Sequence, residues 1–365
     1  MTRLLIAAGG GGDAITAAMV HTALHGRSAP ALVLTYAWER LVVDPVPGPR
    51  GIADFTALDH LAPHLALVTT HTAPKAPAGS LLPRLAGGLR PALGLLDPYD
   101  GTVGLTRQIQ AAAHWCGADR VDLVDVGGDI VARGDEPTLR SPLGDALVLA
   151  ACAATNLSTS VYVAGPGLDN EVPRSVLAPR LGAPAFALAP EDTDDALPVL
   201  DWHPSEAGAM LVAAARGVRG ACGTRDAPAA VVLDDSSPLV YRLAVEDALR
   251  LSPLAQALAL CPSLDAAEKV SQAVCGFSEI ARERRRAALL PPPAAPRPPR
   301  DPDVVLDRYL AFEHARRAEG LAYVTTRRIT EDLALTPTEA DALYASLATG
   351  SPTRRVAPLW RLAPA

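Results

Sequence analysis

The chain has 365 residues, of which 49% are hydrophobic and 20% charged, a composition that suits one or two folded domains and excludes a disordered protein. Its net charge of −7 argues against broad nucleic-acid binding, which depends on neutralising phosphates. Lysine occurs only at Lys75 and Lys269, and neither lies in a motif for Schiff-base or phosphate chemistry.

The compartment is predicted from the cysteines and the apolar runs. The five cysteines have no CxxC or CxxH spacing, which disfavours both a disulfide framework and a structural zinc site. The first residues lack the pattern of a signal peptide, and every apolar run is too short or too interrupted to span a bilayer. We therefore expect a cytoplasmic protein without membrane contact.

Strand and helix patterns alternate through the first two thirds of the chain. Short apolar runs predict strands at residues 4–8, 31–36, 65–70, 121–126, 160–164 and 230–233. Helical patterns lie between them, at residues 13–20, 105–116, 142–154 and 207–215. Such apolar strands, separated by helices, predict an α/β fold with a Rossmann-like, doubly wound, mostly parallel sheet over residues 1–260.

Three further segments follow. A helical extension is predicted for residues 261–290, with one helix over 265–286, and a proline-rich linker for residues 291–303. Residues 304–365 then predict a small C-terminal domain, helical and winged-helix-like, with helices at 304–319 and 338–348. Eight basic side chains of this domain balance eight acidic ones, when Asp303 just before it is included, which favours docking or homo-oligomer formation over nucleic-acid binding.

Three glycine turns, each closed by an aspartate, carry the strongest functional signal. They span residues 9–13, 125–129 and 165–169, and each follows an apolar strand. In the second turn Asp125 and Asp129 flank the glycine pair at the end of the strand. In an open α/β sheet, ligands bind at the carboxyl ends of the strands. If the three strands are parallel neighbours, the three aspartates line one crevice. A plainer interpretation of the first turn is a tight connection with Asp13 as the helix N-cap.

The candidate site residues follow from these turns. Asp13, Asp129 and Asp169 are the predicted catalytic residues, and Asp129 and Asp169 the predicted Mg²⁺ ligands, because clustered carboxylates need a cation, a proton or a donor-rich ligand. The glycines would offer backbone N–H groups to an anion, and Arg40 would bind it. The predicted ligand-binding residues are Gly10, Gly11, Gly12, Arg40, Gly127, Gly128, Ser141, Asp145, Gly165, Gly167, Glu171 and Glu206.

Two other candidates have plainer interpretations. His203 and Glu206 precede a predicted helix and are acid/base candidates, although Ser205 between them fits a helix N-cap. His114 and Cys116 suggest a nucleophile pair, but near neighbours along a helix do not face each other.

As an ordered set, these motifs resemble the domain of unknown function family 1152, found in archaea and actinobacteria. The set also includes residues 38–40 and 44–50, and the resemblance covers about residues 1–245. It implies a Rossmann-like fold with a shared ligand site. The family has Gly-Val-Asp-Gly-Glu at the third turn, where this chain has Leu168 and Asn170, so a different backbone geometry is expected there.

Three functions remain open on this evidence. The first is an enzyme, a transferase or hydrolase assisted by Mg²⁺, acting on a nucleotide, nucleoside or phosphorylated sugar. The second is a non-catalytic small-molecule sensor that couples ligand binding to the C-terminal domain. The third is metal-independent glycosidic-bond chemistry with a carboxylate as the base.

Overall fold

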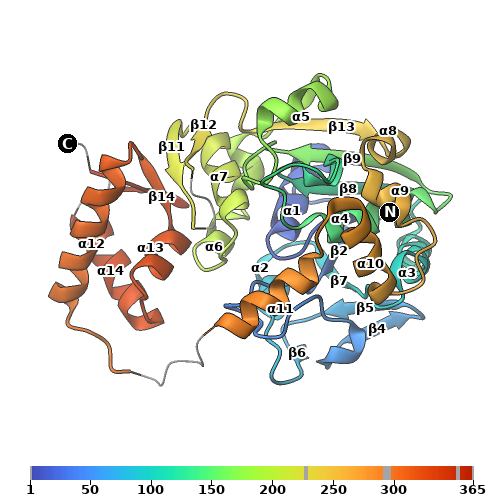
Figure 1. Ribbon diagram of the computed structural model, residues 1–365, viewed down its shortest axis with the longest axis horizontal. Coiled ribbons are helices and arrows are strands. Elements are labelled where there is room, and N and C mark those ends of the chain that lie inside the picture. The colour runs from blue at the N-terminus through green and yellow to red at the C-terminus, as the bar shows by residue number, and fades with distance from the viewer. Residues whose placement is uncertain (1, 226–228, 291–296, 351–353, 364–365) are drawn as a thin grey trace.

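A computed structural model describes residues 2–225, 229–290, 297–350 and 354–363 of the chain. A large central sheet is covered by helices on both faces (Figure 1), which confirms the predicted α/β class and the mostly parallel central sheet. Within the described residues, none of the helices is both long enough and apolar enough to cross a membrane.

The central sheet has nine strands in the order β10-β13-β9-β8-β1-β2-β7-β5-β4. Its middle five strands, from β9 to β7, are parallel, and antiparallel strands flank them on both edges. The strands are β1 (Arg3–Ala7), β2 (Ala31–Tyr36), β4 (Asp59–Ala62), β5 (Leu65–Val68), β7 (Ala92–Leu96), β8 (Arg120–Val126), β9 (Ser158–Ala164), β10 (Pro184–Ala187) and β13 (Leu239–Ala244). A separate pair is formed by β3 (Phe55–Thr56) and β6 (Ala73–Pro74).

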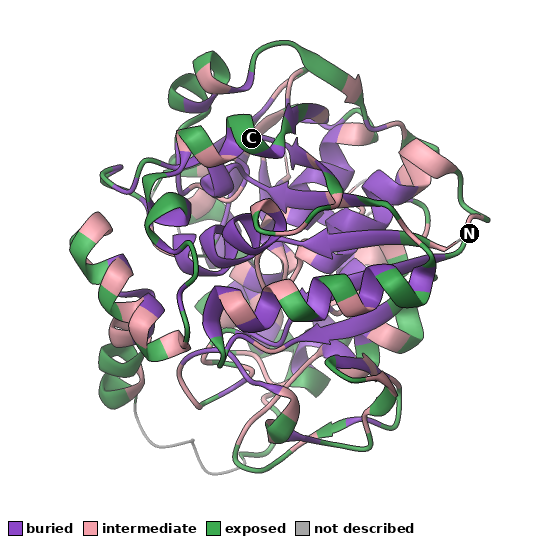
Figure 2. Ribbon diagram, turned by 90° about the vertical axis from the view of Figure 1, so that its right-hand side faces the viewer, coloured by how far each residue is buried: buried purple, intermediate pink, exposed green. Residues whose placement is uncertain are grey.

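Each face of the sheet has its own hydrophobic core, because successive side chains of a strand point to opposite faces. In β1, Leu4 and Ile6 belong to one core and Leu5 and Ala7 to the other. The first core includes side chains of α3 (Gly101–Cys116), α4 (Pro142–Ala153), α5 (Arg174–Leu181), α8 (Val245–Leu251), α9 (Pro253–Ala257) and α10 (Leu264–Cys275). The second includes those of α1 (Asp13–His25), α2 (Leu82–Gly88), α6 (Leu197–Leu200) and α7 (Glu206–Ala215). The strands are accordingly buried between helices (Figure 2).

Two predicted strands do not join the parallel sheet. β5 runs antiparallel to β7. It also pairs with β4 as a hairpin, through a tight connection in which His64 has φ 66°. The strand predicted at residues 230–233 is β12 (Val231–Leu233), which pairs antiparallel with β11 (Gly220–Gly223) in a second sheet. The prediction also missed β7, whose Gly94 interrupts the apolar run. An ideal Cβ there would lie 2.6 Å from Leu34 Cδ2 of the neighbouring strand.

The helix predicted over residues 265–286 is wrong as a single element. It is divided into α10 and α11 (Glu279–Leu289). Gly276 ends α10 in the left-handed conformation at φ 77°, and the Ser278 side chain caps α11 by accepting the Ala281 N–H at 3.0 Å. Both are ordinary helix-ending and helix-starting signals, and together they turn the chain so that α11 lies over the crevice described below.

The C-terminal unit, residues 302–350 and 354–363, has a small core of its own. It contains α12 (Pro302–Ala318), β14 (Tyr323–Thr325), α13 (Thr326–Asp332), α14 (Pro337–Gly350), β15 (Arg355–Val356) and β16 (Leu359–Arg361). Strand β14 pairs with β11, so the second sheet, β12-β11-β14-β16-β15, joins the unit to residues 220–233. The predicted boundaries at 260, 290 and 303 stay predictions, and linker residues 291–296 lie outside the described residues.

Candidate functional site

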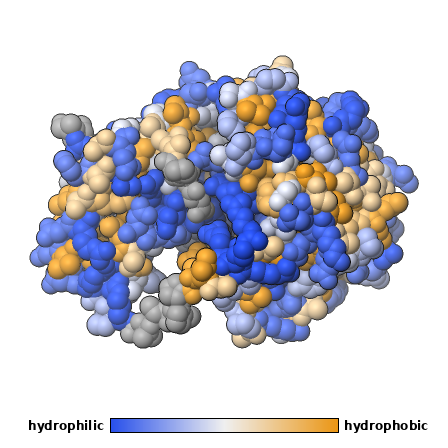
Figure 3. All heavy atoms as spheres, viewed as in Figure 1, coloured by the Kyte–Doolittle hydropathy of each residue, from blue (hydrophilic) through white to orange (hydrophobic). Residues whose placement is uncertain are grey.

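A crevice of about 450 Å³ opens beside the carboxyl ends of β1, β8 and β9. These strands are adjacent and parallel, with Ile6 opposite Leu123 and Val126 opposite Ala164. The three glycine turns therefore follow neighbouring strands, as expected from the sequence. Strongly hydrophilic residues gather in the middle of this face, over and beside α11 (Figure 3).

The structure brings eleven of the fifteen predicted site residues into the wall of the crevice. These are Asp13, Asp129, Asp169, Gly10, Gly11, Gly12, Arg40, Ser141, Asp145, Glu171 and Glu206. The other four, Gly127, Gly128, Gly165 and Gly167, are not lining residues. All four have positive φ, between 56° and 112°, so glycine is required there for the backbone path. Gly127 also makes room for a neighbour, because its Cβ would lie 2.2 Å from the Asp169 Cγ.

The first glycine turn is tightly packed against two other segments. A Cβ at Gly10 would lie 2.6 Å from the Trp38 carbonyl oxygen, and one at Gly12 would lie 2.0 Å from the Ser205 hydroxyl. No described side chain caps α1, whose N-cap residue is Gly12. The Asp13 side chain instead accepts the Gly9 N–H at 2.7 Å, so the predicted N-cap role of Asp13 is wrong. The start of α1 at this turn therefore carries the partial positive charge of a helix N-terminus.

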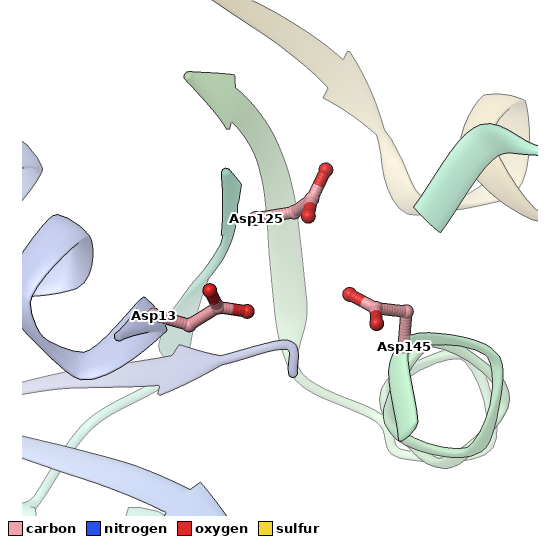
Figure 4. A group of neighbouring side chains, drawn as sticks. All are labelled: Asp13, Asp125 and Asp145. Carbon is pink, nitrogen blue, oxygen red and sulfur yellow. The ribbon is translucent and has the colours of Figure 1, made fainter. Parts of the chain in front are cut away.

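Three carboxylates from three elements lie close together at the crevice, where Asp13 and Asp145 line the wall and Asp125 is buried behind it (Figure 4). Asp13 begins α1, Asp125 lies near the end of β8, and Asp145 lies in the first turn of α4; one ligand oxygen of each lies within 4.8 Å of the others. Burial raises the pKa of Asp13 to about 7, against the lowering effect of the Gly9 N–H. Burial also raises the pKa of Asp125 and of Asp145 well above the usual range, and the neighbouring carboxylates raise both further.

The two predicted metal ligands lie beside this cluster. Asp129 begins a short 3-10 helix after Gly128. Burial raises the pKa of Asp129 well above the usual range, and the charges of Asp145 and Asp125 raise it further. Asp169 accepts the Glu171 N–H at 3.1 Å. Burial, and then the Glu171 charge, raise the pKa of Asp169. Neither belongs to the close group of three carboxylates.

The Glu171 carboxylate is occupied by hydrogen bonds within the protein, which position a neighbouring loop. It accepts the Arg140 N–H at 2.6 Å and the Ser141 N–H at 2.9 Å, and the Ser141 hydroxyl also donates to it. These bonds fix the loop that precedes α4 and thereby the position of Asp145 in the first turn of that helix. The Glu171 and Ser141 side chains are bound to each other here, although both were predicted to bind ligand.

Glu206 links the crevice to the C-terminal unit. Its carboxylate accepts the Arg225 N–H at 2.8 Å, the Thr325 hydroxyl at 2.5 Å and the Arg327 Nη1 at 3.0 Å, while the Arg40 Nη1 lies 4.0 Å away. Arg327 itself lines the crevice. The sequence gives no signal for this contact, because more than 100 residues separate Glu206 from its partners in the C-terminal unit.

His203 is held as a neutral imidazole. Burial, with a further contribution from Arg40, lowers the pKa of His203 to about 3. Its Nδ1 accepts the Ser205 N–H at 3.2 Å, which places the ring proton on Nε2. Ser205 caps α7 by accepting the Gly208 N–H at 3.3 Å, as the plainer sequence interpretation predicts. His203 is thus suited to donate a hydrogen bond and poorly suited to act as an acid at neutral pH.

Sequence reasoning missed the residues that α11 contributes to the crevice. Glu279, Arg282, Glu283 and Arg286 all line it. Their i, i+3, i+4, i+7 spacing is that of one helix face, a signal present in the sequence but hidden by treating residues 265–286 as one helix. Burial raises the pKa of Glu279 well above its usual range. Glu283 accepts the Gly48 N–H at 2.7 Å and the Trp38 Nε1–H at 3.1 Å, which joins α11 to the segment that follows β2.

The third turn accommodates its departure from the family pattern. Asn170 has φ 59°, in the left-handed region that glycine adopts freely and asparagine tolerates. Asparagine at this position can therefore follow the backbone path open to glycine, and the different geometry expected from the sequence stays a prediction.

Comparison with known proteins gives one match. A family model described as "Protein of unknown function (DUF1152)" matches residues 4–287. The match covers the sheet, the three glycine turns, α10 and α11, and so extends beyond residue 245, where the resemblance was expected to end. No curated protein and no solved structure matches the chain.

Proposed function

This chain belongs to the DUF1152 family, and we propose that it is a Mg²⁺-assisted transferase or hydrolase acting on a nucleotide, nucleoside or phosphorylated sugar. The observation that carries the proposal is the position of the uncapped N-terminus of α1, at a glycine turn beside clustered aspartates, in one crevice. Backbone N–H groups at a helix N-terminus suit a phosphate, and carboxylates suit a cation or sugar hydroxyls.

The strand order supports a Rossmann-like assignment of the core. Numbered among themselves along the chain, the five parallel strands run 3-2-1-4-5 across the sheet, with β1 in the centre. The order reverses between β1 and β8, and ligands of doubly wound folds bind outside the carboxyl ends of the strands at such a switch point. The crevice occupies this position.

The charges of the lining favour a polar, anionic ligand. The lining contains nine acidic side chains and five arginines. The arginines are Arg40, Arg140, Arg282, Arg286 and Arg327. Arginine binds phosphate in bidentate fashion, while the acids would accept hydrogen bonds from hydroxyl or amino groups. In this proposal Asp129 and Asp169 contact the reacting group and Asp13 orients it. The five cysteines are free, which fits the reducing cytoplasm that we propose as the compartment.

Turnover assays test the proposal. The full chain is incubated with nucleotides, nucleosides and sugar phosphates, with Mg²⁺ or with EDTA, and products are followed by chromatography and mass spectrometry. We expect turnover that EDTA abolishes. Turnover unaffected by EDTA would support the metal-independent glycosidic reaction instead, and binding without turnover of any tested compound would contradict both enzymatic functions.

A non-catalytic sensor is the second candidate, favoured by the contact between Glu206 and Arg327. The C-terminal unit has the element order helix, strand, helix, helix and hairpin, which supports a winged-helix-like assignment. A ligand that displaces Arg327 from Glu206 would loosen the unit. Hydrogen exchange of α13 and β14, measured with and without bound ligand, tests this: unchanged exchange in both elements would contradict the sensor.

A further inference from the structure

We propose that Asp13, Asp125 and Asp145 together bind one hard divalent cation, Mg²⁺ or Mn²⁺, in place of the Asp129 and Asp169 pair predicted from the sequence. The cation's catalytic role rests on the proposed function, but its binding can be measured without any nucleotide. The first observation is geometric, since one oxygen from each of the three side chains lies within 4.8 Å of the others.

The second observation is that the buried Asp125 carboxylate has neither a basic partner nor a hydrogen bond of ordinary geometry among the described residues. Its side chain comes from a central strand and is 1% exposed, yet neither carboxylate oxygen accepts a hydrogen bond of ordinary geometry within the described part of the chain. The Gly128 N–H and the Asp129 side chain lower the pKa of Asp125, but burial outweighs both. Asp145 is 3% exposed, and its Oδ1 likewise accepts no hydrogen bond from the described residues. Buried carboxylates are normally hydrogen-bonded or paired, because an unpaired buried charge costs several kcal/mol or more. The Asp145 side chain points toward Asp13, and Asp125 lies beside both on the neighbouring strand (Figure 4).

The surrounding backbone keeps this space open. The Gly9 N–H donates to Oδ2 of Asp13 and so fixes that side chain, leaving Oδ1 available. A Cβ at Gly9 would lie 2.5 Å from Oδ2 of Asp13 and 3.5 Å from Oδ2 of Asp145. Any side chain at position 9 would therefore enter the gap between the two carboxylates.

The donor set selects the class of ion. Three carboxylates without nitrogen or sulfur suit hard cations such as Mg²⁺ and Mn²⁺ over Zn²⁺ or Cu²⁺. Ligands on opposite sides of a Mg²⁺ ion lie about 4.2 Å apart, so oxygens within 4.8 Å of one another need only a small adjustment to share one ion. Three ligands leave half of an octahedral shell for water or for phosphate oxygens of a substrate. The first turns of α1 and α4, which carry Asp13 and Asp145, stabilise negative charge at the same place.

Manganese titration of the metal-free full chain tests the site. Free Mn²⁺ is followed by its electron paramagnetic resonance signal at pH 8, first for the parent and then with added Mg²⁺ or Ca²⁺ as competitor. We expect one bound Mn²⁺ that Mg²⁺ displaces. Asp125→Asn and Asp145→Asn should each weaken binding at least about tenfold, since loss of even an outer-shell partner typically costs that much.

Two variants serve as controls. Asp122→Asn changes the same strand, β8, at a residue that pairs with His25 at 3.0 Å, and should leave the Mn²⁺ affinity unchanged. Asp129→Asn should weaken it far less than Asp125→Asn. Absence of stoichiometric Mn²⁺ binding by the parent, or equal losses in Asp129→Asn and Asp125→Asn with both variants folded by circular dichroism, would overturn the assignment. Neither result depends on whether a nucleotide is turned over.

Discussion

Glu206, at the start of α7, and Arg327, at the start of α13, form an ion pair in which Oε2 lies 3.0 Å from Nη1 and each side chain is 7% exposed. Both residues line the crevice, and they come from the two parts of the chain that the second sheet joins. The wall of the crevice therefore depends on the C-terminal unit, although the family match ends at residue 287.

Removing one partner of this pair should be costly. Arg327→Met leaves the Glu206 carboxylate buried with one fewer donor, and we expect a loss of about 3–5 kcal/mol in the free energy of unfolding. Urea denaturation measures it. In a double-mutant cycle with Glu206→Gln, the double variant should lose less than the sum of the single variants. Arg250→Met is the control, because its pair with Asp247 is exposed and worth less than about 1 kcal/mol. Additive losses in the cycle would contradict coupling.

Asp129→Asn should separate binding from stability. The amide is nearly isosteric and removes a charge that burial and four neighbouring carboxylates disfavour, so the melting temperature should stay unchanged or rise. Affinity for a nucleotide should fall at least about tenfold, or about 1.4 kcal/mol. Calorimetric titration with nucleotides, with and without Mg²⁺, measures the affinity. A lower melting temperature with unchanged affinity would instead assign Asp129 a structural role.

Asp13 predicts a pH dependence of stability in the metal-free protein. Burial raises its pKa from 3.8 to about 7, so between these pH values the folded state holds a proton that the unfolded state has released. The contribution of Asp13 to the free energy of unfolding then falls as pH rises through this window and changes no further once the pH is well above 7. Asp13→Asn cannot titrate and keeps an acceptor for the Gly9 N–H.

The stability of Asp13→Asn relative to the parent should therefore increase by about 2–4 kcal/mol across that window. Denaturant unfolding at a series of pH values measures the difference. Asp235→Asn, at a side chain that is 99% exposed, should show no such trend. A constant difference between Asp13→Asn and the parent at all pH values would show that the Asp13 pKa is not raised.

Gly127→Ala should damage the crevice through backbone strain and a clash. The residue has φ 112°, and its new Cβ would lie 2.2 Å from the Asp169 Cγ, so Asp169 must move. We expect a loss of about 1–3 kcal/mol in stability, together with weaker ligand binding. Gly182→Ala is the matched control: its φ is 72°, but the added Cβ meets no described atom within 4 Å. It should lose stability and leave ligand affinity intact. Equal effects of both variants on affinity would argue against a role for Asp169 in binding.

Local patterns in the sequence were sufficient for the elements that build the crevice. The apolar runs and glycine turns predicted β1, β8 and β9 with their connections, because strand periodicity and positive-φ glycines are properties of short segments. The positions at which a helix is interrupted were harder to predict. Gly276 and Ser278 divide α10 from α11 by two adjacent signals within an otherwise helical pattern, and the polar face of α11 was missed for that reason.

The sequence by itself determined the fold class, the family and the aspartates that end three glycine turns. Only the tertiary structure decided which carboxylates meet. Asp125 lies close to Asp13 because β8 pairs in register with β1. Asp145 lies close to both because Glu171 fixes the loop before α4. Arg327 reaches the crevice because β14 pairs with β11, about 100 residues earlier in the chain. Strand register and packing between distant segments set such distances, and composition and spacing along the chain carry no record of either.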